Sequence, residues 1–161
     1  MPRFAHWFAG ALLLLFIGGC GFHLQGSDTM PRSLASVRLE AVDTQSDFCH
    51  GLRAALLSSG TRLDAGVTGA ATIRILEDTT GERVLTVSAR NIPSAFELSY
   101  RVRVAVESQG RELMAPEEHM LTREYSFDER TLLAKERERE VLLQALADDL
   151  VALLMRRFAS L

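Results

Sequence analysis

Residues 100–107, YRVRVAVE, place the tightest constraint on the fold of this chain. Their side chains alternate at the two-residue period of a β-strand, so that one face is apolar and the other is charged. The apolar face carries Tyr100, Val102, Val104 and Val106, and the opposite face carries Arg101, Arg103 and Glu107. The rest of the chain must therefore supply apolar surface to cover one side of this strand.

The C-terminal segment predicts a long helix with a matching apolar face. Its apolar residues recur at steps of three and four. They are Leu142, Leu146, Leu150 and Leu153, with Leu143, Ala147 and Leu154 beside them. We expect this helix to span residues 130–158, with Asp128 as its N-cap and a break after the LLAK segment at 132–135.

A shorter helix is predicted earlier in the chain. Thr44 and Asp47 have the spacing of a capping box, in which two side chains satisfy the unpaired N–H groups of a first helical turn. Gly60 is suited to end the helix in the left-handed conformation. The apolar face between them consists of Phe48, Leu52, Ala55 and Leu56.

Further strands are predicted on both sides of YRVRVAVE. Residues 36–42 alternate, and residues 71–90 are extended. Within the latter, DTTGE at 78–82 is either a hairpin turn or a bulge in one long bent strand, and the residues alone leave both open. RNIP at 90–93 and SQGRE at 108–112 are predicted turns, and residues 117–127 form another strand.

This order of elements predicts an α+β fold, a two-layer sandwich with two helices packed on one face of a sheet. The opposite sheet face is either open to water or covered by a partner. Its predicted basic residues are Arg38, Arg74, Arg101 and Arg103.

The first 19 residues have the plan of an export signal. Arg3 forms a basic start, an apolar run follows from Phe8 to Ile17, and Gly18 and Gly19 form a small-residue exit. The apolar run is shorter than the roughly 20 residues that span a bilayer. The whole chain carries a formal net charge of −3, and loss of Arg3 makes it more acidic. Such a chain is not expected to coat nucleic acid, which is bound by neutralising phosphates.

Cys20, the first residue after this signal, has two possible roles. It could pair with Cys49 in a disulfide, or Ile17-Gly18-Gly19-Cys20 could be a lipobox, which resembles the signal of bacterial lipoproteins. A chain terminus is usually mobile, so a disulfide formed there would add little to the stability of the fold. The same position is well suited to a membrane anchor. We therefore predict that Cys20 carries a diacylglycerol and an N-acyl chain, which together give stable membrane attachment.

The neighbours of Cys20 extend this prediction. Gly21 is not acidic, which by resemblance to enterobacterial sorting rules points to the outer membrane. Residues 20–35 are then the lipidated N-terminus and tether, and residues 36–161 a single domain. Cys49 is left as a small, half-buried core residue.

No constellation of residues predicts catalysis, and we expect neither an enzyme nor a metal site. The histidines that remain after export lack metal-ligand spacing, and adjacent side chains such as Cys49 and His50 diverge on a helix. The histidines are His23, His50 and His119. The paired carboxylates at 117–118 and 148–149 are explained by ordinary solvated surface. No cofactor is expected beyond the lipid on Cys20.

Lys135 is the only lysine of the chain, among 17 arginines. It directly precedes ERERE at 136–140, whose alternating charges are typical of a solvated helix face. A retained lysine in an arginine-rich chain favours a role for its ammonium group. A surface lysine spared by chance is an equally weighted explanation.

Two motifs resemble the LptE family of lipopolysaccharide-assembly lipoproteins. CGFHLQG at 20–26 follows the lipobox, and REYSFDERTLLAKERE at 123–138 leads into a helix that ends DLVALLMRRF. The resemblance implies two helices on a mixed sheet of about four strands. It also favours one long bent strand with a bulge at DTTGE.

The same resemblance implies partners and site residues. The partner is the outer-membrane barrel LptD, and the resemblance implies that this domain is held inside the barrel lumen as a plug. The lipid anchor is implied to lie on the periplasmic side of the outer membrane. Lipopolysaccharide is the transported molecule and is also bound by the family through basic residues, which fall on Arg90 and Lys135. Arg101 and Arg103 are candidates to face the barrel. The alternative is a pilotin-like or structural lipoprotein of another envelope machine.

Overall fold

The computed structural model describes residues 30–63, 66, 69–126 and 132–161. The signal at 1–19, Cys20 with its tether as far as residue 29, and Asp128 lie outside the described residues. The elements are η1 (Arg32–Leu34), β1 (Ser36–Ala41), α2 (Asp47–Ser58), β2 (Arg62–Leu63), β3 (Ala71–Val87), β4 (Pro93–Ser108), β5 (Arg111–Ser126) and α3 (Leu132–Ala159).

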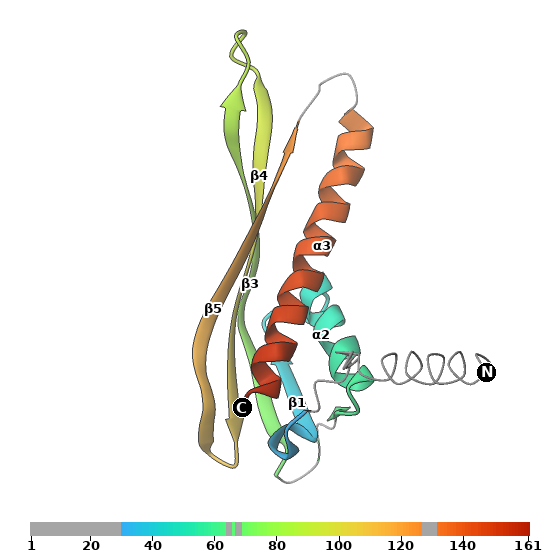
Figure 1. Ribbon diagram of the computed structural model, residues 1–161, viewed down its shortest axis with the longest axis vertical. Helices are drawn as coiled ribbons and strands as arrows, with labels where there is room; N and C mark the ends of the chain where they lie inside the picture. Colours follow the sequence, from blue (N-terminus) through green and yellow to red (C-terminus); the bar gives the residue numbers. More distant parts are fainter. Residues whose placement is uncertain (1–29, 64–65, 67–68, 127–131) are drawn as a thin grey trace, which may run out of the picture.

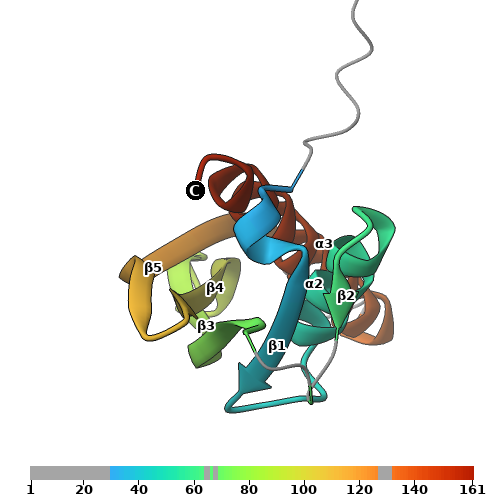
Figure 2. The same cartoon turned by 90° about the horizontal axis from the view of Figure 1, so that it is seen from below.

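The predicted α+β sandwich is confirmed, with α2 and α3 on one side of a single mixed sheet (Figures 1 and 2). Among the described residues the sheet has five strands in the order β2-β1-β3-β4-β5, against the four or so expected. β1 runs parallel to β2 and β3, and the other pairs are antiparallel. The extra strand β2 has two residues, which is too short for any periodicity to reveal it.

β3 is one continuous strand, so the hairpin explanation of DTTGE is wrong. Residues 78–82 pair without interruption with residues 98–102 of β4. The bulge expected at DTTGE lies just before it, between Ile75 and Glu77, and further register shifts occur between Val84 and Val87. A bulge bends a strand and increases its twist, which accommodates the length of β3.

The core lies between the sheet and the two helices. The predicted strand face is confirmed, since Tyr100 and the three valines of YRVRVAVE are at most 3% exposed. α3 contributes Leu146, Ala147, Leu150, Val151, Leu154 and Phe158. Leu153 is only half-buried, whereas Leu150 and Leu154 are buried. The buried face of α3 is therefore centred closer to Leu154 than the sequence pattern predicted.

α3 runs without a break from Leu132 to Ala159, so the interruption expected after Lys135 is wrong. The described residues of its N-terminal half are half-buried or exposed, and full burial begins at Leu146. In that half, Leu142 and Leu143 are partly buried against the core, and Arg139 pairs with Glu82 of β3.

The start of α2 differs from the predicted capping box. Ser46, not Thr44, is the N-cap, and its Oγ accepts a hydrogen bond from the Cys49 N–H at 3.0 Å. The Ser46 hydroxyl also donates to Asp78 Oδ2 at 2.5 Å, which ties the helix start to β3. Gly60 adopts a φ of 84° after the helix, as predicted.

Gly51 is explained by the crossing of the two helices. A Cβ added at Gly51 would lie 3.3 Å from Val151 Cγ2 of α3, which is a tight contact. Glycine weakens a helix by about 1 kcal/mol relative to alanine. Here it permits the close approach of α2 to α3.

Cys49 lies in α2 with its side chain fully buried and its thiol free. The prediction of a small core residue is confirmed, with deeper burial than expected. Burial raises the pKa of the Cys49 thiol, so the nucleophilic thiolate is disfavoured.

Candidate functional site

Arg90 lies exposed in the turn between β3 and β4. The Ser88 N–H donates to the Ile92 carbonyl at 2.7 Å, and the Asn91 N–H donates to the Ser88 carbonyl at 2.9 Å. Asn91 has a φ of 61°, which asparagine tolerates better than most residues. The predicted turn at RNIP is confirmed, and it holds Arg90 at the tip of a long hairpin.

Lys135 lies in the first turn of α3, and its side chain is 17% exposed. Its Nζ donates to Glu138 Oε2 at 2.6 Å. Sequence reasoning treated ERERE as solvated surface and missed this partner. The i, i+3 spacing of Lys135 and Glu138 is the signal that could have found it.

The structure brings the elements that carry Arg90 and Lys135 to the same end of the molecule. The β3–β4 turn and the start of α3 both lie at the top of the long axis in Figure 1. We call this end the cationic pole. The described start of the chain, near η1, and its C-terminus lie at the opposite end (Figures 1 and 2).

In the part of the chain that the structure describes, three ion pairs attach α3 to the sheet along its length. Arg139 Nε lies 2.7 Å from Glu82 Oε2 of β3. Farther along, Asp149 Oδ2 lies 2.7 Å from Arg123 Nη2 of β5. Near the C-terminal end, Arg157 donates twice to Glu117 of β5, with distances of 2.7 and 3.2 Å. These pairs join α3 to β3 and β5 beside the packed core.

The last of these pairs predicts a pH dependence of stability. The Arg157 guanidinium lowers the pKa of the Glu117 carboxyl below its usual value of 4.5. A carboxyl with a lowered folded-state pKa stabilises the fold above its unfolded pKa and loses that contribution as pH falls through the folded value. Glu117→Gln should therefore lower the free energy of unfolding at pH 7 by about 0.2–1 kcal/mol and flatten its fall between pH 5 and 3.

Urea denaturation at a series of pH values measures this effect. Glu118→Gln is the matched control, because Glu118 is the next residue on β5 and its carboxylate is 3.7 Å from Arg101 on the opposite face. An equal loss for both variants at every pH would contradict a specific role of the Glu117–Arg157 pair.

The outer sheet face carries Arg101 and Arg103 as predicted, but it is not simply arginine-rich. Carboxylates lie between the arginines. Arg101 is 3.9 Å from Glu77 and 3.7 Å from Glu118. The strand register places Arg103 opposite Glu77 on one side and Glu118 on the other. The outer face therefore carries alternating positive and negative side chains, because residues that pair across neighbouring strands share a face.

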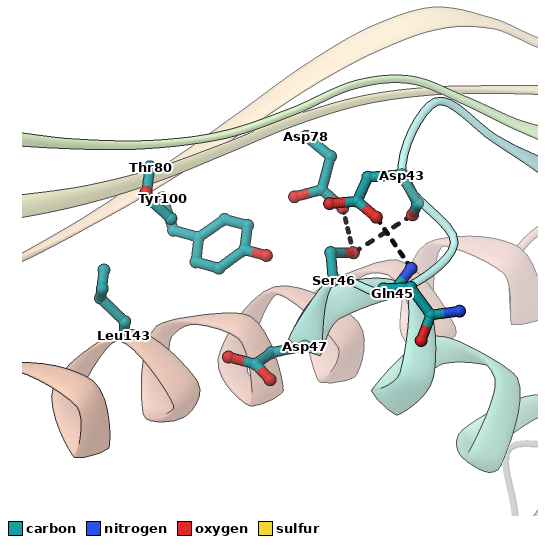
Figure 3. Close-up of a pocket in the computed structure, with 8 residues that line it drawn as sticks. All are labelled: Asp43, Gln45, Ser46, Asp47, Asp78, Thr80, Tyr100 and Leu143. Carbon is teal, nitrogen blue, oxygen red and sulfur yellow. Dashed lines mark hydrogen bonds between the residues drawn. The ribbon is translucent and has the colours of Figure 1, made fainter.

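A cavity of about 290 Å³ lies where the start of α2 meets β3, β4 and α3 (Figure 3). It is lined by Asp43, Gln45, Ser46, Asp47, Asp78, Thr80, Tyr100 and Leu143. Burial, followed by the charge of Asp78, raises the pKa of Tyr100, so this hydroxyl stays protonated. Three carboxylates repel phosphate, and the cavity therefore does not suit an anionic ligand.

In residues 30–63, 66, 69–126 and 132–161, no group of three or more His, Cys, Asp or Glu side chains is arranged to hold a metal ion. No helix in the same part of the chain is long and apolar enough to cross a bilayer.

This arrangement of two helices on a mixed sheet recurs in a class of bacterial lipoproteins. The uncharacterized lipoprotein B from Nitrosomonas europaea is 25% identical, with a TM-score of 0.72 over 87% of this chain and 91% of that protein. The rare lipoprotein B from Shewanella oneidensis is 24% identical, with a TM-score of 0.70 over 78% of this chain and 94% of that protein.

The family follows from the sequence. Residues 34–158 match the family model LptE, described as lipopolysaccharide-assembly, and the chain belongs to this family. The LPS-assembly lipoprotein LptE of Yersinia enterocolitica is 27% identical over 148 residues, which cover 91% of this chain and 71% of that protein. The LPS-assembly lipoprotein LptE of Yersinia pestis is 26% identical over the same shares.

Proposed function

We propose that this protein is an outer-membrane lipoprotein that fills the lumen of the LptD barrel and helps insert lipopolysaccharide into the outer leaflet. We further propose that it binds lipopolysaccharide itself, through Arg90 and Lys135. Membership of the lipopolysaccharide-assembly family supports a role in lipopolysaccharide assembly. The placement of Arg90 and Lys135 at one end of the fold supports the proposed lipopolysaccharide-binding site.

The observation that carries the proposed site is the cationic pole. Arg90 and Lys135 are 45 residues apart in sequence and come from a strand turn and a helix start, yet both elements reach the same end of the fold. Lipid A carries phosphates, which arginine and lysine bind by charge-assisted hydrogen bonds. The Glu138 carboxylate that pairs with Lys135 would be exchanged for a phosphate oxygen on binding.

The charged outer sheet face supports the proposed place in a barrel. The lumen of a large outer-membrane barrel is polar, so a plug needs a polar surface. Arg101 and Arg103 with their neighbouring glutamates offer both charge signs to such a wall. A barrel surface that contacts them would need interleaved charges of its own, since one sign alone would leave like charges opposed.

The site is tested by reversing both charges of the cationic pole. Arg90→Glu with Lys135→Glu should weaken lipopolysaccharide binding by about tenfold or more, because two attractive contacts with phosphate become repulsive. Binding of fluorescent lipopolysaccharide to the purified protein measures this effect. Circular dichroism and thermal unfolding check that the fold is retained.

Arg62→Glu with Arg111→Glu is the control for net charge, because both residues are exposed and lie outside the turn and the start of α3. Binding weakened equally by both pairs would indicate a general charge effect and would remove the assignment of Arg90 and Lys135. Co-purification of the detergent-solubilised protein tests the partner. A large barrel supports the proposal, and recovery of a secretin ring supports the pilotin-like alternative.

A further inference from the structure

Two valines near the cationic pole leave much of their apolar surface uncovered. Val84 is 48% exposed and Val87 is 54% exposed, and both lie in the last four residues of β3, just before the hairpin tip. Surface apolar residues that are scattered singly need no explanation. Val84 and Val87, however, are only three residues apart and lie on the same hairpin as Arg90. They therefore form a small exposed apolar patch beside the proposed site.

A register shift places both valines on one side of the hairpin. Val84 pairs with Phe96, and the next pair is Thr86 with Ala95, so Leu85 is an extra residue in β3. Paired residues share a face, so Thr86 lies with Ala95 on the face opposite Phe96. A second shift lies between Thr86 and Val87, where Ser94 is the extra residue in β4 and Val87 pairs with Pro93. β3 has no extra residue at this second shift, so Val87, which directly follows Thr86, returns to the face of Val84. Without the bulge, Val84 and Val87 would point to opposite sides.

The shared face is the one toward the helices. Phe96, the partner of Val84, stacks on Tyr125 with ring centroids 5.6 Å apart, and Tyr125 is only 7% exposed in the core. The start of α3, with Lys135, lies on this same side of the sheet (Figure 1). The apolar strip of Val84 and Val87 thus lies on the side of the hairpin that faces the start of α3, with Arg90 beyond it at the tip.

We propose that Val84 and Val87 contact the acyl chains of lipopolysaccharide while Arg90 and Lys135 bind its phosphates. This inference rests on the proposed function and assigns a second half to the same site. An amphiphile with anionic groups at the root of its acyl chains matches a surface in which cations border an apolar strip. Apolar contact of this kind removes hydrocarbon from water, and it adds affinity that a phosphate alone could not supply.

Isosteric substitutions test the apolar contact. Val84→Thr with Val87→Thr keeps the shape and the β-branching of both side chains and replaces one methyl group of each by a hydroxyl. Val42→Thr with Val141→Thr is the matched control, because these two valines are 66% and 65% exposed and lie outside the hairpin, just after β1 and in α3. The full-length protein, purified in detergent, is titrated with fluorescent lipid A and separately with the same phosphorylated disaccharide after complete removal of its acyl chains.

We expect the Val84/Val87 pair to bind lipid A about tenfold more weakly than the wild type, since two buried methyl groups are lost. It should bind the deacylated disaccharide as the wild type does, and the control pair should bind both normally. The Arg90/Lys135 reversal should weaken binding of both ligands.

Two outcomes overturn the inference, and they are distinguishable. Undiminished lipid A binding by the Val84/Val87 pair, with weakened binding by the Arg90/Lys135 reversal, removes the apolar contact and leaves the proposed phosphate site intact. Unchanged binding of both ligands by the Arg90/Lys135 reversal removes the proposed site and the inference with it.

Discussion

Leu150→Ala should lower the free energy of unfolding by about 2–5 kcal/mol, because it leaves a cavity where α3 packs on the sheet. Leu150 is fully buried near the middle of the apolar stripe of α3. The fully buried residues of α3 lie between Leu146 and Phe158, so the contacts around Leu150 contribute strongly to the attachment of the helix to the sheet. Urea denaturation of a soluble form without residues 1–20 gives the measurement.

Leu57→Ala makes the same chemical change in a helix at a residue that is 55% exposed. It should alter stability by less than about 1 kcal/mol, since little packing is lost and alanine favours helix. A small effect of Leu150→Ala, similar to that of Leu57→Ala, would show that α3 is held mainly by its ion pairs. The pairs Arg139–Glu82 and Arg123–Asp149 would then be the next residues to change.

Replacing residues 1–20 with an ordinary cleavable export signal should move the protein from the outer-membrane fraction to the soluble periplasm. The predicted lipid on Cys20 is the reason. Each buried methylene contributes about 0.8 kcal/mol, and several chains together give stable attachment. Fractionation followed by immunoblotting measures the change, and mass spectrometry of the wild-type N-terminus detects the acyl groups.

A variant with Ser27→Ala is the control for a change near the N-terminus that leaves the lipobox intact, and it should remain in the membrane fraction. Wild-type protein with an unmodified N-terminus would contradict the anchor directly. Retention of the signal-replaced form in the outer membrane would instead indicate that contact with a membrane partner is sufficient to hold the domain there.

The parts of the fold that could be predicted are those with a repeated pattern. The alternation at 100–107 and the stripe of α3 are both set by burial on one face, and burial decides the fold at those residues. The missed features lack a repeat. β2 has two residues, the cap at Ser46 depends on a contact with Asp78 in β3, and the exact place of the bulge, between Ile75 and Glu77, depends on the pairing of two long strands.

The candidate site was predictable only in part for a similar reason. Arg90 and Lys135 could be proposed from motifs, because each lies in a recognisable local segment. That their elements reach one end of the fold is a property of the hairpin length and of the direction of α3. The apolar strip beside them depends on the single extra residue Leu85, and no sequence pattern marks that bulge.

The position of the N-terminal tether limits the orientations that an anchored domain can adopt relative to the membrane. Ten residues from Cys20 to Met30 span at most about 36 Å when fully extended. α3 alone, with 28 residues, measures about 42 Å and runs from the cationic pole toward the end where the described chain begins. If Cys20 carries the predicted lipid, its tether is shorter than α3, so the domain cannot stand with its cationic pole against the leaflet that holds the anchor. Arg90 and Lys135 would then lie at the end of the domain farthest from the anchor.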